Sequence, residues 1–320
     1  MNDKAENTIA AVSLERERFV IMSMAENKIT AVDVHEMVHP FGLMCFQEDA
    51  RDLEIHRDAL DNMIQKSGIS GLKLGVVIGE DMVHVKRIPM ALGFDEEALD
   101  SQMKWEAKQL LLSPEDTFHK VYQRLPAKTA SGNPYYLLVL IRKQVLKALR
   151  SLIESAGCFL HEIEVDIFSH LRALQMNYTF EQEDRIVLLR MQSSGCIFTF
   201  IVQGDYYLSH RIHLPKMGSL ASSEVVEVVK KELRRLVFGH RLGNDIGDLK
   251  KIFIFGNSAA STLVQDLEKD LPIPVEKMNP LKRIGMTTEL SQSKEILKYP
   301  DRFTATIGML LKNHPQLVQA

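Results

Sequence analysis

The chain has 320 residues, of which 45% are hydrophobic and 25% charged, and its formal net charge is -3. This length suits one large domain or two lobes, and the near-neutral charge gives no general argument for a nucleic-acid-binding or membrane-surface protein. No apolar run approaches the roughly 18 residues that span a bilayer, and the first residues have no signal-peptide pattern. The cysteines, Cys45, Cys158 and Cys196, are odd in number and widely spaced. They favour reduced, buried thiols in a cytosolic protein.

The N-terminal region has the pattern of a strand meander. Apolar, β-branched runs at 9–13, 19–24 and 29–38 are separated by the polar turns LERE and AENK. A helical pattern over 49–67 and two strand patterns, over 72–79 and 83–90, follow.

The run 29–38, with the residue that follows it, contains H-E-x-x-H, formed by His35, Glu36 and His39. On a helix, the two histidines would bind zinc, Glu36 would be the general base, and Cys45 could be a third ligand. On a strand, the histidines lie roughly 13 Å apart at about 3.3 Å per residue, too far for one ion with bonds of about 2.1 Å. Pro40 also disfavours a helical His39. We therefore expect no bound metal. A zinc metallopeptidase remains the minority alternative. Stoichiometric zinc in the purified protein, lost in His39→Ala, would support it.

Helical and strand patterns alternate along the rest of the chain. Helices are predicted over 96–112, 144–156, 168–178, 224–238, 258–271 and 303–312, and strands over 119–125, 135–141, 160–167, 185–191, 196–202, 206–214, 252–256 and 275–278. Ser222 or Ser223 is the expected cap of the 224–238 helix, and its basic run KKELRR is expected to be a solvated face. A three-strand meander followed by a helix and a strand occurs twice, which predicts two similar α/β lobes with an insertion in the first.

Four stretches resemble, in chain order, the actin-like ATPases, and within them the type IV pilus assembly protein PilM and its relative FtsA. They are RIPMALGFDEEALDSQMKWEAKQLL (87–111), YYLLVLIRKQVLKALRSLIESAGC (135–158), LHEIEVDIFSHLRAL (160–174) and FTATIGMLLK (303–312). The resemblance implies an α/β, two-lobed actin-like (ribonuclease H-like) fold. It implies a small inserted α+β subdomain in the first lobe and a reduced second lobe. The implied segments are 1–82 (first lobe), 83–159 (insertion), 160–182 (return helix of the first lobe), 183–300 (second lobe) and 301–320 (closing helix and tail).

The sequence departs from this family at the nucleotide loops. Actin-like ATPases carry a D-x-G turn on the first hairpin of each lobe, where Gly lets backbone N–H groups approach phosphate and Asp positions Mg²⁺. Here Ser13 and Arg190 stand at the Asp positions, and Glu15 and Gln192 at the Gly positions. A carboxylate at Glu15 would repel phosphate.

Two further features point the same way. The family's G-G turn near the adenosine is Gly256-Asn257 here. Only PKMGSLA separates Leu214 from Ser222, where the family has an extra subdomain that forms one wall of the cleft. We therefore expect no bound nucleotide or other cofactor, and a pseudo-ATPase rather than an enzyme.

The resemblance also implies a partner. PilM proteins bind the cytoplasmic N-terminal tail of the membrane protein PilN, which requires no ATP hydrolysis. We therefore expect a cytoplasmic scaffold of a type IV pilus or related secretion machine, held at the inner membrane through that partner, with no nucleic acid bound and self-association left open. Trp105, the single tryptophan, and Glu106 are the expected partner-binding residues, because aromatic anchors often dominate such contacts. A plain packing role for Trp105, and an active actin-like ATPase that Mg-ATP would protect against heat, are the alternatives.

Overall fold

The computed structural model describes residues 8–46, 52–111, 114–129, 131–214, 220–256 and 261–312. The chain forms two compact units. The first contains residues 1–177, 280–298 and 303–320, and the second contains 178–279 and 299–302. Across the described ranges, no helix combines the length and apolar character needed to cross a bilayer.

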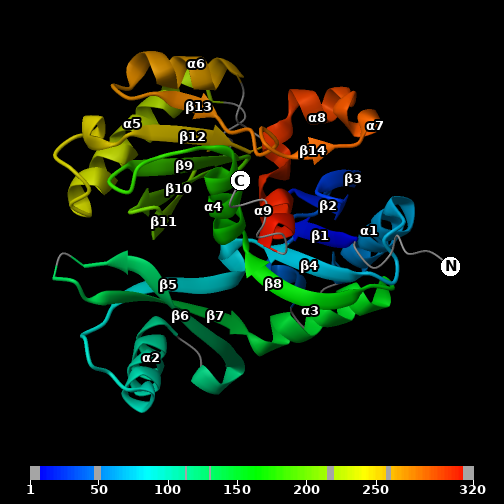
Figure 1. Ribbon diagram of the computed structural model, residues 1–320, viewed down its shortest axis with the longest axis horizontal. Helices are drawn as coiled ribbons and strands as arrows, with labels where there is room; N and C mark the ends of the chain where they lie inside the picture. The colour runs from blue at the N-terminus through cyan, green and yellow to red at the C-terminus, as the bar shows by residue number, and fades with distance from the viewer. Residues whose placement is uncertain are drawn as a thin grey trace. The chain divides into compact units, whose positions relative to one another are not determined.

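The first unit is built on a six-stranded sheet with the order β14-β3-β2-β1-β4-β8 (Figure 1). Its strands are β1 (Ile9–Leu14), β2 (Arg18–Ala25), β3 (Lys28–Glu36), β4 (Lys73–Ile78), β8 (Phe159–Val165) and β14 (Gly285–Met286). The first three form the predicted antiparallel meander, and β4 and β8 join it in parallel. Period-two patterning and short polar turns thus predicted this part correctly.

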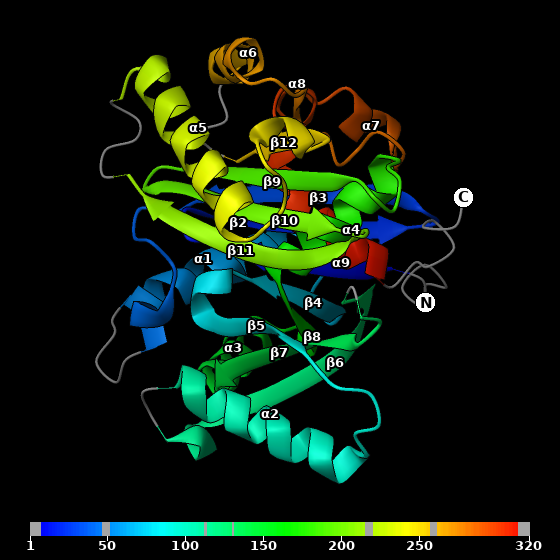
Figure 2. The ribbon, with the colours of Figure 1, turned by 90° about the vertical axis from the view of Figure 1, so that its left-hand side faces the viewer.

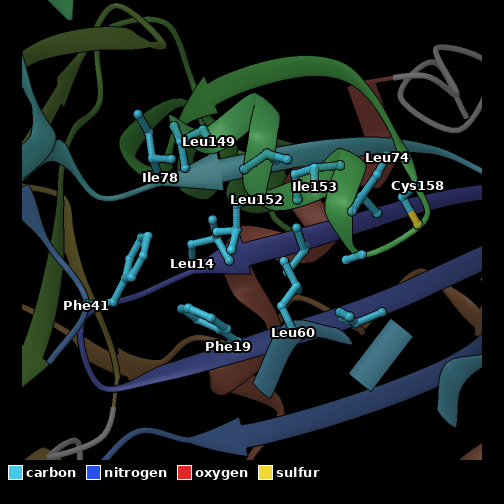
Figure 3. Close-up of a cluster of buried hydrophobic side chains, with 14 of the residues drawn as sticks. Leu14, Phe19, Phe41, Leu60, Leu74, Ile78, Leu149, Leu152, Ile153 and Cys158 are labelled. Carbon is cyan, nitrogen blue, oxygen red and sulfur yellow. The ribbon is translucent and has the colours of Figure 1, made fainter. Parts of the chain in front are cut away.

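Helices cover both faces of this sheet. On one face, α1 (Asp52–Ser67), α3 (Lys143–Ser155) and the short helix η1 (Leu43–Phe46) contribute to one apolar core cluster. Figure 3 shows side chains of the sheet, among them Leu14 and Phe19, gathered with Leu60 of α1 and Leu149 of α3. On the other face, α9 (Thr304–Lys312) packs against β1 and against α4 (Asp166–Asn177). Helices thus pack on both faces of the sheet.

A three-stranded antiparallel sheet with the order β5-β7-β6 forms the predicted insertion. It contains β5 (Val83–Pro89), β6 (Phe118–Lys128) and β7 (Pro134–Arg142). The helix α2 (Glu96–Leu110) lies along one face of this sheet and is capped by the Asp95 carboxylate, which accepts a hydrogen bond from the Ala98 N–H at 2.8 Å (Figure 2). Met103 and Ala107 join the apolar cluster between helix and sheet. Although α3 falls within the predicted 83–159 segment, its apolar face packs on the six-stranded sheet instead.

The second unit is a five-stranded sheet with the order β11-β10-β9-β12-β13. Its strands are β9 (Arg185–Gln192), β10 (Gly195–Val202), β11 (Asp205–His213), β12 (Lys251–Phe255) and β13 (Val275–Lys277). The first three repeat the antiparallel meander, as predicted. The helices α5 (Ser222–Gly239) and α6 (Ser261–Asp270) cover the same face of the sheet (Figure 1).

The start of α5 differs from the sequence prediction. Ala221 holds the N-cap position, and its N–H donates to the Glu224 carboxylate at 2.9 Å. The prediction of a serine cap was therefore wrong: Ser222 is the first helical residue, and its hydroxyl donates to the Asp266 carboxylate at 2.6 Å.

Residues 280–298 were predicted to lie in the second lobe, but they belong to the first unit. Here β14 pairs with β3, and two short helices that the sequence did not indicate, α7 (Thr288–Ser291) and α8 (Lys294–Lys298), follow it. The Asn177 side chain fixes this return, because its amide N–H donates to the Pro280 carbonyl at 2.7 Å and its oxygen accepts from the Arg283 N–H at 2.9 Å.

Candidate functional site

The first nucleotide-loop position lies on the hairpin between β1 and β2. Ser13 is fully buried, and its hydroxyl accepts a hydrogen bond from Thr306 of α9 at 2.9 Å. Glu15 is also buried, and its carboxylate lies 3.2 Å from Nε of Arg18. The backbone N–H of Glu15, at the position where the family uses a Gly amide, donates to the Arg18 carbonyl at 3.0 Å. These groups are therefore engaged with neighbours of their own unit.

The second loop position lies on the hairpin between β9 and β10. Arg190 and Gln192 lie at the end of β9 that leads into the hairpin turn, and each is buried, with an exposed fraction of 8%. Gln192 pairs with Gly195 across the hairpin. The structure thus has a buried cation and a buried amide where the family has an acidic Mg²⁺ contact and a glycine.

Gly256 follows β12 directly and has φ of 105°, a conformation that favours glycine. A Cβ here would lie 2.3 Å from the Met191 carbonyl oxygen, so a larger residue does not fit. Its N–H donates to the buried Asp301 carboxylate at 3.1 Å, and Lys277 pairs with the other oxygen of Asp301 at 3.0 Å. The amide of this turn is therefore bonded to a side chain of the same unit. Asn257 lies outside the described residues.

The H-E-x-x-H segment is not helical. His35 and Glu36 are the last residues of β3, and His39 lies in the bend before Pro40. Cys45 is buried in η1, where its thiol donates to the Pro40 carbonyl at 3.6 Å. Among the described residues, no three or more His, Cys, Asp and Glu side chains are grouped to hold a metal ion. The geometry thus lacks the helical face on which a zinc peptidase places its two histidines.

The two expected partner-binding residues lie side by side on α2 but differ in environment. Trp105 points to solvent with 54% of its surface exposed, off the helix face that packs on the sheet. Glu106 is buried, and its carboxylate accepts from Lys86 Nζ at 2.7 Å and from the Gln102 side chain at 3.3 Å. Glu106 thus joins α2 to β5, whereas Trp105 is free to contact a partner.

Charged groups around α2 are organised within the insertion. Lys120 and Lys104 hold the pKa of Asp100 at about 2, because both ammonium groups hydrogen-bond to that exposed carboxylate. Burial lowers the pKa of His84, and the nearby Arg142 guanidinium lowers it further. His84 is therefore expected to stay neutral at pH 7.

Sequence reasoning missed the internal partners of the loop positions. Thr306 and Asp301 were not singled out, since each lies far along the chain from the loop residue that it contacts. Lys277, which pairs with Asp301, was not singled out either. The only local signal was the Arg three residues after Glu15 in the same hairpin.

Similarity to known proteins appears in structure and not in sequence. No protein-family model matches the chain, and the comparison with curated proteins gives no match. Among solved structures, a chain of a PilM–PilN type IV pilus biogenesis complex is similar with a TM-score of 0.76 and 12% identity, over 95% of this chain and 98% of that chain.

Two other solved structures are similar at lower scores. A Bacteroides thetaiotaomicron protein with an actin-like ATPase fold has a TM-score of 0.51 and 12% identity, over 88% of this chain and 95% of that chain. The cytoplasmic domain of EpsL, an inner membrane component of the type II secretion system of Vibrio cholerae, has a TM-score of 0.50 and 9% identity, over 90% and 96%. At such identities the likeness establishes the fold. The chain thus has the actin-like α/β fold, in the form found in the PilM–PilN complex, as the sequence resemblance implied.

Proposed function

We propose that this chain is a non-enzymatic docking subunit of a type IV pilus or related secretion machine. It binds the cytoplasmic N-terminal tail of a PilN-like inner-membrane protein and is held at the membrane through that tail. The observation that carries this proposal is a contrast within the chain. The inserted subdomain presents Trp105 to solvent, whereas Ser13 and Glu15 contact Thr306 and Arg18 of their own unit, and the Gly256 amide donates to Asp301.

The loop chemistry supports the non-enzymatic part. A phosphate cradle needs free backbone N–H groups and a nearby acidic group for Mg²⁺. At Glu15 and Gly256 the amides donate to internal acceptors, and Ser13 in place of an acid hydrogen-bonds to Thr306. Opening these bonds for a nucleotide would leave buried polar groups unpaired, and each such group opposes binding by about 1–3 kcal/mol.

The docking part rests on fold likeness together with exposed apolar groups on the insertion. Leu92, Phe94, Trp105 and Val121 are each at least 44% exposed, although the subdomain has its own packed cluster. Aromatic and aliphatic side chains of this kind are the anchors through which extended or short helical peptides bind.

Mg-ATP is expected neither to bind nor to stabilise the protein. A ligand at 100 times its dissociation constant stabilises a folded protein by about 2.7 kcal/mol, so micromolar binding would give a clear thermal shift at millimolar Mg-ATP. Titration calorimetry of the full chain is the primary measurement, and ATP with EDTA is the control. Micromolar binding that requires Mg²⁺ would overturn the non-enzymatic assignment and support an active ATPase.

Trp105→Ala is expected to weaken tail binding about 30-fold, the effect of losing an aromatic hot spot. The probes are biotinylated peptides with the N-terminal tails of inner-membrane proteins from the same organism, titrated against the full chain. Deleting residues 83–159 would be uninformative, because that segment includes α3, whose residues such as Leu149 belong to the main core.

Arg150→Ala, at an exposed position of α3, is the control and should leave binding unchanged. Equal binding by the Trp105 and Arg150 variants would remove Trp105 from the docking surface. If the full chain bound none of the tails, the docking function itself would be wrong.

A further inference from the structure

The C-terminal half of α5 carries a surface that the proposed function does not use. Lys231, Arg234 and Phe238 recur at i, i+3 and i+7, so they share one stripe of the helix. All three are exposed, Phe238 to 77%. The opposite stripe, with Leu233 and Leu236, is buried in the core of the second unit. Figure 2 shows α5 as a long helix lying along the sheet of this unit.

Most charges along this helix have partners, but those of the stripe do not. Lys230 pairs with Asp270 at 2.7 Å, and Nε of Arg235 donates to Glu232 at 3.0 Å. By contrast, the described part of the chain places no ion-pair partner at Lys231 or Arg234. One acidic side chain, Glu227, stands one turn earlier on the same stripe.

The residues that end α5 add another cation. The Leu242 N–H donates to the Val237 carbonyl at 2.8 Å, and the Arg241 N–H donates to the Phe238 carbonyl at 3.1 Å. This is a Schellman motif, in which Arg241 takes the left-handed position, with φ of 54°. Glycine normally occupies that position, because a side chain there is strained. Here an exposed guanidinium occupies it, also without an ion-pair partner in the described ranges.

We propose that Lys231, Arg234, Phe238 and Arg241, here called the basic tip, contact the anionic headgroups of a lipid bilayer directly. Unpaired cations around a protruding aromatic ring are the side chains that lie in a membrane interface. The three cations match the negative surface of an anionic bilayer, and Phe238 is the kind of apolar side chain that inserts at its interface.

The basic tip alone is expected to bind the bilayer weakly. It is expected to contribute when the chain is already held at the membrane by the partner tail of the proposed function. Each Lys or Arg near an anionic surface strengthens binding about fivefold, so three give on the order of a hundredfold. A second anchor would then orient the second unit at the membrane by raising the effective concentration. The basic tip lies outside the insertion, so its failure and failure of tail binding can be told apart.

The test is co-sedimentation of the full chain with phosphatidylglycerol–phosphatidylcholine vesicles, compared with phosphatidylcholine vesicles. Binding should require the anionic lipid and fall with added salt. The double variant Lys231→Gln with Arg234→Gln should bind about 25-fold more weakly. Phe238→Ala should weaken binding further. Lys269→Gln, at an exposed lysine of α6 in the same unit, is the matched control and should bind like the unaltered chain.

Arg241→Gly is the sharpest variant, because it removes one charge while relieving the backbone. It should bind vesicles about fivefold more weakly and unfold at the same or a higher temperature. Absence of binding to anionic vesicles at low salt, or equal binding by the double variant and the Lys269 control, would overturn the proposal. Tighter binding to polyglutamate than to vesicles, lost in the same variants, would assign the surface to an acidic protein and would also overturn it.

Discussion

Replacing Arg172 by Met is expected to destabilise the folded chain by about 3 kcal/mol at pH 7, because it leaves a buried carboxylate poorly compensated. The Glu164 side chain is only 8% exposed. Its two oxygens accept from Arg172 at 2.8 and 2.9 Å, and it also accepts from Ser169 at 2.6 Å. Arg172 additionally donates to the Gly308 carbonyl at 2.7 Å, so it joins β8, α4 and α9. Urea unfolding measures the loss.

The pH dependence identifies the mechanism. Burial by itself raises the pKa of Glu164, but Arg172, Ser169 and Lys312 outweigh it and hold that pKa below the ordinary value of 4.5. This ion cluster therefore stabilises the native state above about pH 4.5, and the stabilisation is lost as the pH falls through the lowered pKa. In Arg172→Met, burial dominates and raises the pKa of Glu164. The Glu164 carboxylate of the native variant therefore takes up a proton more readily as the pH falls. The difference between the two proteins should therefore shrink from pH 7 to about pH 4.

Two control variants test whether the charge of Glu164 causes the loss of stability in Arg172→Met. Glu164→Gln combined with Arg172→Met should recover part of the stability, because the buried charge is removed with its partner. Arg150→Met, at an exposed position of α3, should change stability by no more than about 0.5 kcal/mol. A pH-independent loss in Arg172→Met would show that packing, and not the charge of Glu164, sets the effect.

Gly308→Ala is expected to be at least as disruptive, at about 3 kcal/mol or more. A Cβ at Gly308 would lie 1.9 Å from the Ser169 carbonyl oxygen, and a backbone group cannot move aside as a side chain can. The helices α4 and α9 would have to separate, which would also strain the Arg172 hydrogen bond to Gly308. Thermal unfolding should show a fall of about 6–12 °C, from the usual 2–4 °C per kcal/mol for domains of this size.

The control for Gly308 is Gly239→Ala, at the last residue of α5, where a Cβ would meet nothing within 4 Å. This change should be neutral or slightly stabilising, since Ala favours helix over Gly. If Gly308→Ala unfolded at the same temperature as Gly239→Ala, the close helix contact would not be a constraint on the fold.

The candidate site was predictable only in part. The unusual residues at loop positions 13, 15, 190 and 192 can be identified from the sequence, because each position either carries the Asp or Gly of the motif or does not. The residues that surround these positions in space cannot be identified from the sequence. Ser13 meets Thr306 at a separation of 293 residues, and Gly256 meets Asp301 at a separation of 45 residues. Glu106 looked available beside Trp105, yet it is buried against Lys86, since one residue of rotation on a helix exchanges an exposed face for a packed one.

The sequence by itself determined the two strand meanders, most helices and the presence of an insertion. These features follow from local patterning: alternation every two residues, apolar stripes at helical spacing, and turns of polar residues. Only the tertiary structure decided that α3 packs on the six-stranded sheet, that 280–298 return to the first unit, and that Arg241 ends α5 in a left-handed conformation. Each of these depends on which surfaces meet after the chain has collapsed. The hydrophobic effect is non-directional. A local apolar pattern therefore specifies that a face of a helix or strand is buried, but it does not specify which distant part of the chain packs against that face.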